Sequence, residues 1–155
     1  MKKYFIHIAA LSLMAAMACQ KPINLASEEE AIKEVIKQQN DANNKHNLEG
    51  EAAVWAHEPY VLRIVRTTTV GWDSVNAYYK RLFAKPQNQT KQIVTYSDFK
   101  IRISGSSAWA VFDQNIDYES NGKKQSGKTM EIRFFEKTEG QWKIVLQITG
   151  SQSGY

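Results

Sequence analysis

The chain has 155 residues, of which 43% are hydrophobic and 23% are charged, and its formal net charge is +4. This length suits one domain, and a composition near the globular average excludes collagen-like, coiled-coil and wholly disordered proteins. The single cysteine excludes an internal disulfide and any metal site that needs several cysteine ligands.

The amino terminus has the pattern of an export signal. A short basic start precedes an apolar run that falls short of the roughly 20 residues needed to cross a bilayer. The run ends at Cys19, and this junction resembles a bacterial lipoprotein signal, which implies cleavage before Cys19 and acylation of that cysteine. We therefore expect a signal peptide at 1–18, a lipidated linker at 19–26 and one domain at 27–155, exported and anchored in a membrane through Cys19. The alternative is a plain signal peptide, with Cys19 as an ordinary buried thiol.

Removal of a signal peptide would also reduce the positive charge. It takes Lys2 and Lys3 from the 20 basic residues and leaves 18 against 16 acidic ones. The pairs Lys80-Arg81 and Lys123-Lys124 are isolated, so a nucleic-acid-binding surface is not supported.

Apolar periodicity predicts three helices in the first half of the chain. Ser27 and the acidic residues that follow it are typical of a helix start, and this helix should run to Asn44 with a polar second half. A short second helix is expected at 48–55 and a third at 72–84. The β-branched segment 60–66 predicts a short strand between them.

The second half of the chain predicts a four-strand antiparallel meander at 92–103, 108–119, 124–137 and 142–149. Asn121-Gly122 is a strong hairpin signal between the middle two strands. Alternation places three apolar sets on one face of their strands: Ile93, Phe99, Ile101 and Ile103; Met130, Ile132 and Phe134; and Trp142, Ile144, Leu146 and Ile148. Three N-terminal helices followed by such a curved, mainly antiparallel sheet indicate an α+β domain.

Several segments carry a family resemblance. They are the Glu-rich start of the first helix, Leu48–Trp55, Gly71-Trp72-Asp73-Ser74-Val75, Ser104–Val111 and Gly140–Val145. Their order over residues 28–148 resembles the nuclear-transport-factor-2-like superfamily, in its SnoaL-like branch with the cystatin-like fold. The resemblance implies a cone-shaped cystatin-like roll, a pocket between the helices and the concave sheet, and often a homodimer through the outer face of the sheet. Members include isomerases, cyclases and dehydratases as well as non-catalytic binding domains, so the fold leaves the function open.

The resemblance also implies a position for a catalytic carboxylate, and this chain lacks one there. Steroid isomerases of the superfamily carry their base in the strand after the second helix, and the corresponding position falls at Arg63. The oxyanion-binding tyrosine of those enzymes corresponds to a position near Gln39. Arginine stays protonated and cannot act as the base, so isomerisation by that mechanism is not expected. Arg63 could instead bind a carboxylate or sulfate through paired hydrogen bonds; alternatively, it forms an ion pair with an acid of the first helix or points to solvent.

The expected pocket combines aromatic and polar side chains. Its predicted ligand-binding residues are Gln39, Asn43, Trp55, His57, Tyr60, Arg63 and Tyr79. His57 is the one candidate for a catalytic acid or base, and the alternative is a turn histidine that hydrogen-bonds the backbone before Pro59. With few histidines and no spare cysteine, neither a metal site nor a cofactor is expected.

Polar residues on the later strands predict a charged outer face, on which opposite charges pair across strands. These residues are Asp113, Asn115, Asp117, Glu119, Glu131, Arg133 and Lys143. If the domain forms a homodimer through this face, Trp109, Val111 and Val145 would supply its apolar contacts.

The sequence therefore predicts an exported lipoprotein whose SnoaL-like pocket binds a small organic, anionic ligand without catalysis, or serves as an accessory domain. Two alternatives remain open. One is an enzyme of the cyclase, dehydratase, isomerase or hydrolase type that uses the same pocket. The other is a structural dimerisation module with no open pocket.

Overall fold

The computed structural model describes residues 24–85, 92–120 and 123–151. It contains three helices, α1 (Leu25–Asn44), α2 (Leu48–Val54) and α3 (Trp72–Phe83). The six strands are β1 (Leu62–Val65), β2 (Thr67–Val70), β3 (Gln92–Ser104), β4 (Ser107–Ser120), β5 (Lys123–Thr138) and β6 (Gln141–Ser151). The predicted signal peptide and Cys19 lie outside the described residues. Within the described part of the chain, none of the helices is both long and apolar enough to cross a bilayer.

The helix α1 begins earlier than the sequence predicts. Asn24, not Ser27, is its cap, because the Asn24 side chain accepts a hydrogen bond from the Ser27 backbone N–H at 3.3 Å. Leu25 and Ala26 are therefore helical, which corrects the predicted linker at 19–26. Asn47 is the N-cap of α2, and its side chain accepts a hydrogen bond from the Gly50 N–H. Gly71 is the N-cap of α3, and its φ of 80° suits a residue without a Cβ.

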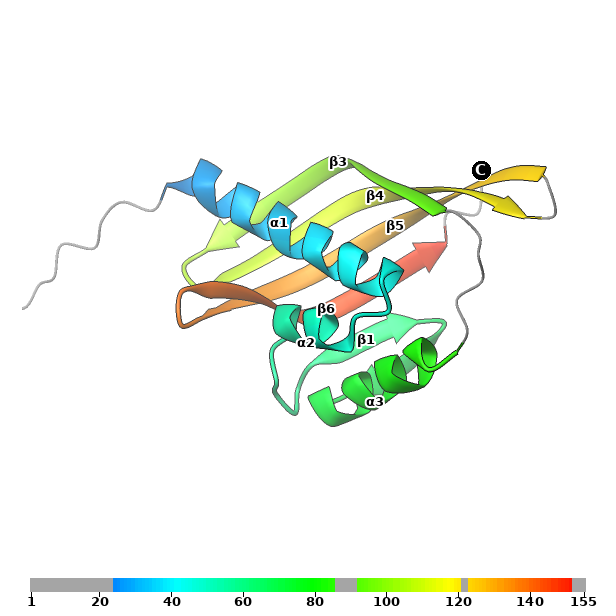
Figure 1. Ribbon diagram of the computed structural model, residues 1–155. Helices are drawn as coiled ribbons and strands as arrows, with labels where there is room; N and C mark the ends of the chain where they lie inside the picture. Colours follow the sequence, from blue (N-terminus) through cyan, green and yellow to red (C-terminus); the bar gives the residue numbers. More distant parts are fainter. Residues whose placement is uncertain (1–23, 86–91, 121–122, 152–155) are drawn as a thin grey trace, which may run out of the picture.

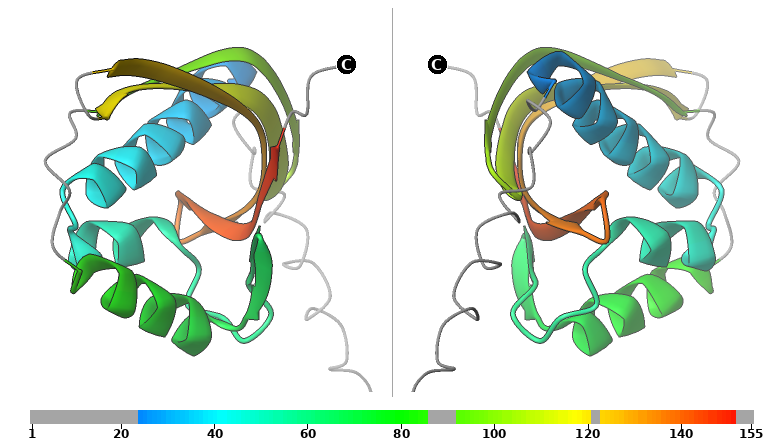
Figure 2. Two further views of the ribbon diagram at one scale, coloured as in Figure 1. Left: turned by 90° about the vertical axis from the view of Figure 1, so that its right-hand side faces the viewer. Right: turned by 90° about the vertical axis from the view of Figure 1, so that its left-hand side faces the viewer.

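The six strands form one sheet in the order β2-β1-β6-β5-β4-β3. All neighbours are antiparallel except β1 and β6, which run parallel. The strand β2 was not predicted; its three threonines pair with β1 across a one-residue turn at Arg66, which has a φ of 61°. The predicted α+β class, with helices packed on a curved and mainly antiparallel sheet, is confirmed (Figure 1). The long strands curl around α1, and α2 and α3 lie beneath it (Figure 2).

A β-bulge in the last strand reverses part of the predicted apolar face. Phe134 pairs with Leu146 but Phe135 pairs with Ile144, so Val145 is an extra residue on β6. Ile144 consequently faces the core and is fully buried, whereas Leu146 faces outward beside the exposed Phe134. The prediction that Trp142, Ile144, Leu146 and Ile148 share one face was therefore wrong, because the last two face outward.

A second bulge, in β3, also changes which residues of the strand face the core. The register shifts between Ser97 and Lys100, where Asp98 has a φ of 56°. Tyr96 and Phe99 thus both pack towards the core, and their rings lie 6.4 Å apart. Ile93 falls on the opposite face and is 55% exposed, so its predicted grouping with Phe99 was wrong.

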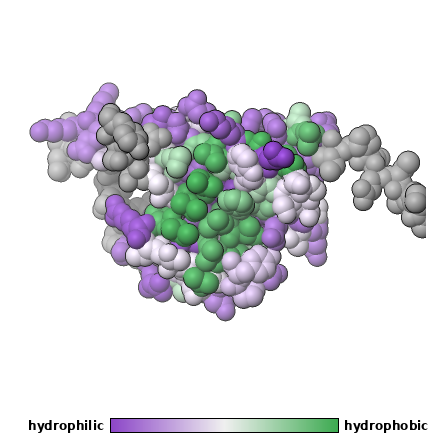
Figure 3. All heavy atoms as spheres, turned by 180° about the vertical axis from the view of Figure 1, so that it is seen from behind, coloured by the Kyte–Doolittle hydropathy of each residue, from purple (hydrophilic) through white to green (hydrophobic). Residues whose placement is uncertain are grey.

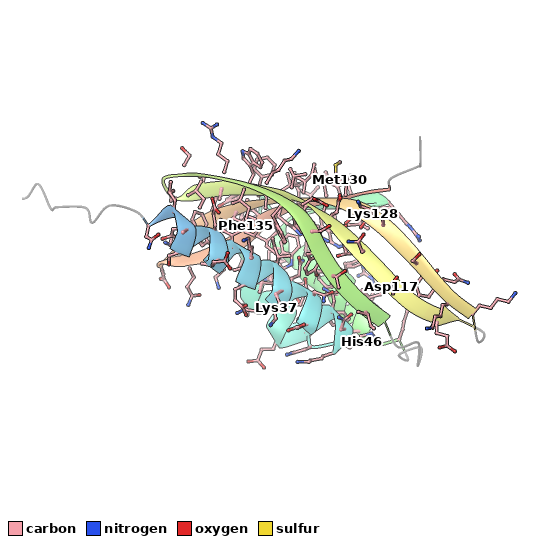
Figure 4. All side chains as sticks on the ribbon, turned by 90° about the horizontal axis from the view of Figure 1, so that it is seen from above. Lys37, His46, Asp117, Lys128, Met130 and Phe135 are labelled. Carbon is pink, nitrogen blue, oxygen red and sulfur yellow. The ribbon has the colours of Figure 1, made fainter. Side chains whose placement is uncertain are left out.

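The core lies between α1 and the concave face of the sheet. Ile32 and Ile36 of α1, Trp55 after α2, and Phe112 and Phe135 of the sheet are almost fully buried. Seen from above, Phe135 lies on the α1 side of β5 and Met130 on the outer side (Figure 4).

Candidate functional site

A cavity of about 270 Å³ opens between the polar half of α1, the helix α3 and the concave face of the sheet. The helices contribute Ile36, Gln39, Asn40, Asn43, Asn44 and Tyr79 to its wall. The strands contribute Arg63, Val94, Tyr96, Gln114, Arg133 and Gln147. Because α1 buries Ile32 and Ile36 and then Gln39 one turn further on, the helix changes from core element to cavity wall along its length.

Three polar residues form a row across the base of this cavity. The register of β1 with β6 places Arg63 beside Gln147, and the register of β6 with β5 places Gln147 beside Arg133. Their exposed fractions are 6%, 8% and 4%, respectively. Neighbouring strands lie about 4.8 Å apart, so the two arginine backbones are about 10 Å apart with the glutamine between them.

Arg63 has an unusual environment for a buried cation. Its Nη2 donates a hydrogen bond to the Tyr78 hydroxyl at 3.1 Å, and its guanidinium carbon lies 3.9 Å from the centre of the Tyr78 ring. Its Nε has no hydrogen-bond partner, and no ion pair joins Arg63 to any described carboxylate. Neither sequence-based alternative, an ion pair with the first helix or exposure to solvent, holds within the described residues.

Arg133 differs from Arg63 because its charge is compensated. Its Nη1 lies 2.7 Å from Glu131 Oε2, and the two side chains are 5% and 1% exposed. Glu131 also accepts hydrogen bonds from the hydroxyls of Thr129 and Thr149, each at 2.9 Å. This corrects the predicted charged outer face: Glu131 and Arg133 point inward, whereas Asp113 does lie outward, where it pairs with Lys128.

The sequence analysis missed Glu51, which is fully buried behind the cavity wall. Its carboxylate accepts hydrogen bonds from Gln39 and from the Trp55 indole N–H at 3.1 and 2.9 Å, and from Asn43. Burial raises the pKa of Glu51, and the donated hydrogen bonds oppose that effect. The available signal was its spacing, because Glu51 lies on the same face of α2 as Leu48 and Trp55.

Gln39 connects these groups into one network. Its Nε2 donates to Glu51 and to Gln147 Oε1, and its Oε1 accepts from Arg133 Nε at 3.2 Å. Gln147 Oε1 also accepts a hydrogen bond from the Tyr79 hydroxyl at 3.3 Å. Buried polar groups with satisfied hydrogen bonds hold one another in place, so the base of the cavity is pre-organised.

A model of the SnoaL-like domain family matches residues 32–152. The chain belongs to the SnoaL-like domain family. This matched region contains every residue of the cavity wall. A search of curated proteins gave no significant match.

Solved structures share the fold of this SnoaL-like domain at low sequence identity. An NTF2-like superfamily protein from Salmonella enterica is 19% identical with a TM-score of 0.68, covering 84% of this chain and 99% of that one. An NTF2-like protein with a cystatin-like fold from Novosphingobium aromaticivorans is 16% identical with a TM-score of 0.67, covering 84% and 86%. A protein from Streptomyces avermitilis, described as a candidate dehydratase of the NTF2-like family, is 13% identical with a TM-score of 0.70, covering 83% and 99%.

Of the predicted ligand-binding residues, the SnoaL-like domain brings Gln39, Asn43, Arg63 and Tyr79 together in the cavity wall. The other three lie elsewhere. Trp55 is buried in the core and donates to Glu51, while Tyr60 is 53% exposed and donates to Glu136 at 2.6 Å.

His57 is also outside the cavity wall, which corrects its predicted placement at the pocket. It is exposed, its ring stacks on Trp72 with centroids 4.2 Å apart, and its Nε2 lies 2.9 Å from the Ala52 carbonyl oxygen. This is the turn histidine that the sequence analysis offered as the alternative.

A wider groove of about 480 Å³ lies at the other end of α1, against the turn between β5 and β6. Its Glu28 and Lys137 are already paired, since the Glu28 carboxylate accepts hydrogen bonds from Lys137 Nζ at 2.6 Å and from the Trp142 indole N–H at 2.7 Å. These contacts hold the pKa of Glu28 below its usual range. The cavity at Arg63, with its buried donor that lacks a partner, is the better candidate site.

The wall of this cavity is rich in side chains that donate hydrogen bonds. Among the described residues, its wall contains two guanidinium groups but neither a carboxylate nor a histidine. The same part of the chain contains no group of three residues suited to holding a metal ion. The arrangement can therefore donate hydrogen bonds to an anion.

Proposed function

We propose that the SnoaL-like domain binds a small organic anion in this cavity without converting it. One observation carries the proposal: the Arg63 side chain is buried, with an exposed fraction of 6%, and its Nε has no hydrogen-bond partner. Burying a cation without a counter-charge is costly, so a protein that keeps one beside a cavity gains most when an anion completes the site. A carboxylate or sulfate matches the planar, bidentate geometry of a guanidinium group.

The surroundings of the cavity support an anion rather than a cation. Arg133 is neutralised by Glu131, and the Glu51 oxygens accept hydrogen bonds from Gln39, Asn43 and Trp55 rather than from Arg63. Arg63 is therefore the uncompensated charge of the cavity wall. Tyr78 and Tyr79, whose rings lie 3.9 and 5.6 Å from its guanidinium carbon, hold this side chain in place.

The experiment is a titration of the purified protein with simple carboxylates, preceded by mass spectrometry of small molecules that co-purify with it. We expect binding that is weakened by Arg63→Met, which removes the charge but keeps much of the side-chain volume. A hydrogen bond to a charged group contributes about 1.5–3 kcal/mol, so the affinity should fall by about 10- to 100-fold. Arg81→Met on the exposed face of α3 is the matched control and should bind as the wild type does. Unchanged binding in Arg63→Met, with its fold intact by circular dichroism, would contradict the proposal.

A homodimer through the outer face of the sheet is a second proposal, and the register of four strands favours it. One apolar row across the strands is Trp109, Phe134, Leu146 and Leu62; the next is Val111, Ile132, Ile148 and Ile64. The molecule seen from behind shows a continuous apolar area on this side (Figure 3). Such a patch on a soluble domain usually marks an interaction surface. A flat, two-fold-symmetric contact with a second copy would cover both rows at once.

Export and anchoring through Cys19 complete the proposed function. The support is the amino-terminal sequence: a basic start, a short apolar run and the chain's single cysteine at its end. Acylation of this cysteine with more than one chain would hold the domain stably at a membrane surface. The anion would then be met outside the cytoplasm.

A further inference from the structure

Carboxamide side chains dominate the wall of the cavity, and this composition restricts the ligand beyond its charge. Six of the wall residues carry a carboxamide: Gln39, Asn40, Asn43, Asn44, Gln114 and Gln147. Only Ile36 and Val94 are aliphatic, and the aromatic wall residues Tyr79 and Tyr96 each carry a hydroxyl. Carboxamides both donate and accept hydrogen bonds, so they suit a ligand with many hydroxyl groups.

An apolar ligand would be poorly matched to this wall. It would exclude water from the wall carboxamides that lie outside the Gln39 network, Asn40 and Gln114 among them, without replacing their hydrogen bonds, and an unsatisfied buried polar group is destabilising. A hydroxylated ligand exchanges one hydrogen bond for another. This asymmetry favours a hydroxylated ligand over a fused ring system of similar size.

The charges of the row restrict the ligand to one anionic group. Arg133 and Glu131 form a buried pair at 2.7 Å, so Arg133 brings little net charge to the cavity. Arg63, two strands away, has no described carboxylate partner. One anionic group at the Arg63 end balances the positive charge of the cavity. A second anionic group would find no unpaired cation among the described wall residues.

The volume restricts the size. Cavities that hold drug-sized molecules span about 300–1,000 Å³, and this cavity of about 270 Å³ lies just below that range. A single ring or a short open chain fits such a space better than a polycyclic molecule.

We infer that the ligand is a small hydroxylated monocarboxylate of the sugar-acid type. Its carboxylate binds Arg63, and its hydroxyls bind the carboxamides of Asn40, Gln114 and Gln147. This inference rests on the proposed anion-binding function and names the chemical class that the same site would accept.

The test is a calorimetric comparison of three probes with the full-length protein at one ionic strength. Glucuronate carries both the charge and the hydroxyls, cyclohexanecarboxylate carries the charge alone, and glucose carries the hydroxyls alone. We expect glucuronate to bind at least about tenfold more tightly than either other probe, because each well-placed hydrogen bond contributes up to about a factor of ten. Equal or tighter binding of cyclohexanecarboxylate would overturn the sugar-acid inference.

Variants separate this inference from the function on which it rests. Gln114→Met removes a carboxamide from the inner face of β4, where the register places Gln114 opposite Tyr96 and Thr129. It should weaken glucuronate several-fold and leave cyclohexanecarboxylate unchanged, while Gln38→Met on the exposed side of α1 should alter neither. Arg63→Met should weaken both acids.

Each outcome has one meaning. If both acids bind equally and both depend on Arg63, anion binding stands and the sugar-acid class is wrong. If only glucose binds, or if no probe binds while the protein is folded, the proposed function and this inference both fail.

Discussion

The buried pair of Arg133 and Glu131 leads to a stability prediction that also tests the charge assignment of the cavity. The change is Arg133→Met, which keeps much of the side-chain volume and removes the charge. The carboxylate of Glu131, 1% exposed, then loses the guanidinium nitrogen that lies 2.7 Å away. We expect a marked loss of stability, because one partner of a buried ion pair remains without its counter-charge.

The magnitude follows from the contacts that remain. At 2.7 Å the attraction between unit charges is about 6 kcal/mol with an effective dielectric constant of about 20, and it offsets the dehydration of both groups. Removing one partner of such a pair costs about 3–5 kcal/mol. Glu131 would keep the hydroxyls of Thr129 and Thr149, so we expect the lower end, about 3 kcal/mol.

The assay is urea unfolding at pH 7, followed by tryptophan fluorescence. Adding Glu131→Gln to Arg133→Met should recover at least half of the lost unfolding free energy, because the isolated buried charge is removed. The matched control is Lys128→Met, which breaks an ion pair of similar length, 2.6 Å, in which the lysine side chain is 45% exposed. Equal unfolding midpoints for Arg133→Met and Lys128→Met, or further destabilisation by the second substitution, would refute the reasoning.

Three further predictions concern other parts of the chain. Burial raises the pKa of Glu51, so its contribution to stability is greatest in acid and falls as the pH rises from the ordinary glutamate pKa of about 4.3 to the raised value. Over that interval the unfolding free energy of Glu51→Gln should increase relative to that of the wild type, as measured by urea unfolding at several pH values. A difference that does not change with pH would contradict this. Phe134 is 42% exposed on the outer face, so Phe134→Glu should convert the proposed dimer into monomers, with the mass measured by light scattering. The control Leu25→Glu, at the 57% exposed start of α1, should leave the dimer intact. A monomeric wild type would refute the dimer. Cys19→Ser should move the protein from the membrane to the soluble fraction and remove the acyl mass from its amino terminus, and an unmodified Cys19 in the wild type would disprove the anchor.

Local signals predicted most of the secondary structure. The helix α2 and the long strands β3 to β6 lie within a few residues of their predicted bounds, because apolar periodicity and turn residues act over short distances. The start of α1 and the strand β2 were missed because local signals did not decide them. Asn24 competes with Ser27 as a cap, and the Thr67–Val70 segment becomes a strand only by pairing with β1.

The candidate site was predicted in part. Arg63, Gln39, Asn43 and Tyr79 were expected in the pocket, and all four lie in the cavity wall. Gln147 and the inward direction of Arg133 were missed, because the alternation along β5 was interpreted as placing Met130 and Phe134 on the inner face. Met130 and Phe134 instead face outward, and Glu131 and Arg133 are buried as a pair. Pattern alone cannot separate an apolar interaction surface from an apolar core.

The sequence by itself determined the order of the three helices and the long strands, the α+β class and the family, because propensity, capping and periodicity are properties of neighbouring residues. Only the tertiary structure decided which side of each strand faces the cavity. The bulges at Asp98 and Val145 reverse the alternation of side chains, and the parallel pairing of β1 with β6 brings Arg63 beside Gln147, although the two are far apart in the chain. A one-residue shift in register exchanges the two faces of a strand, so the location of a buried charge depends on long-range pairing rather than on local sequence.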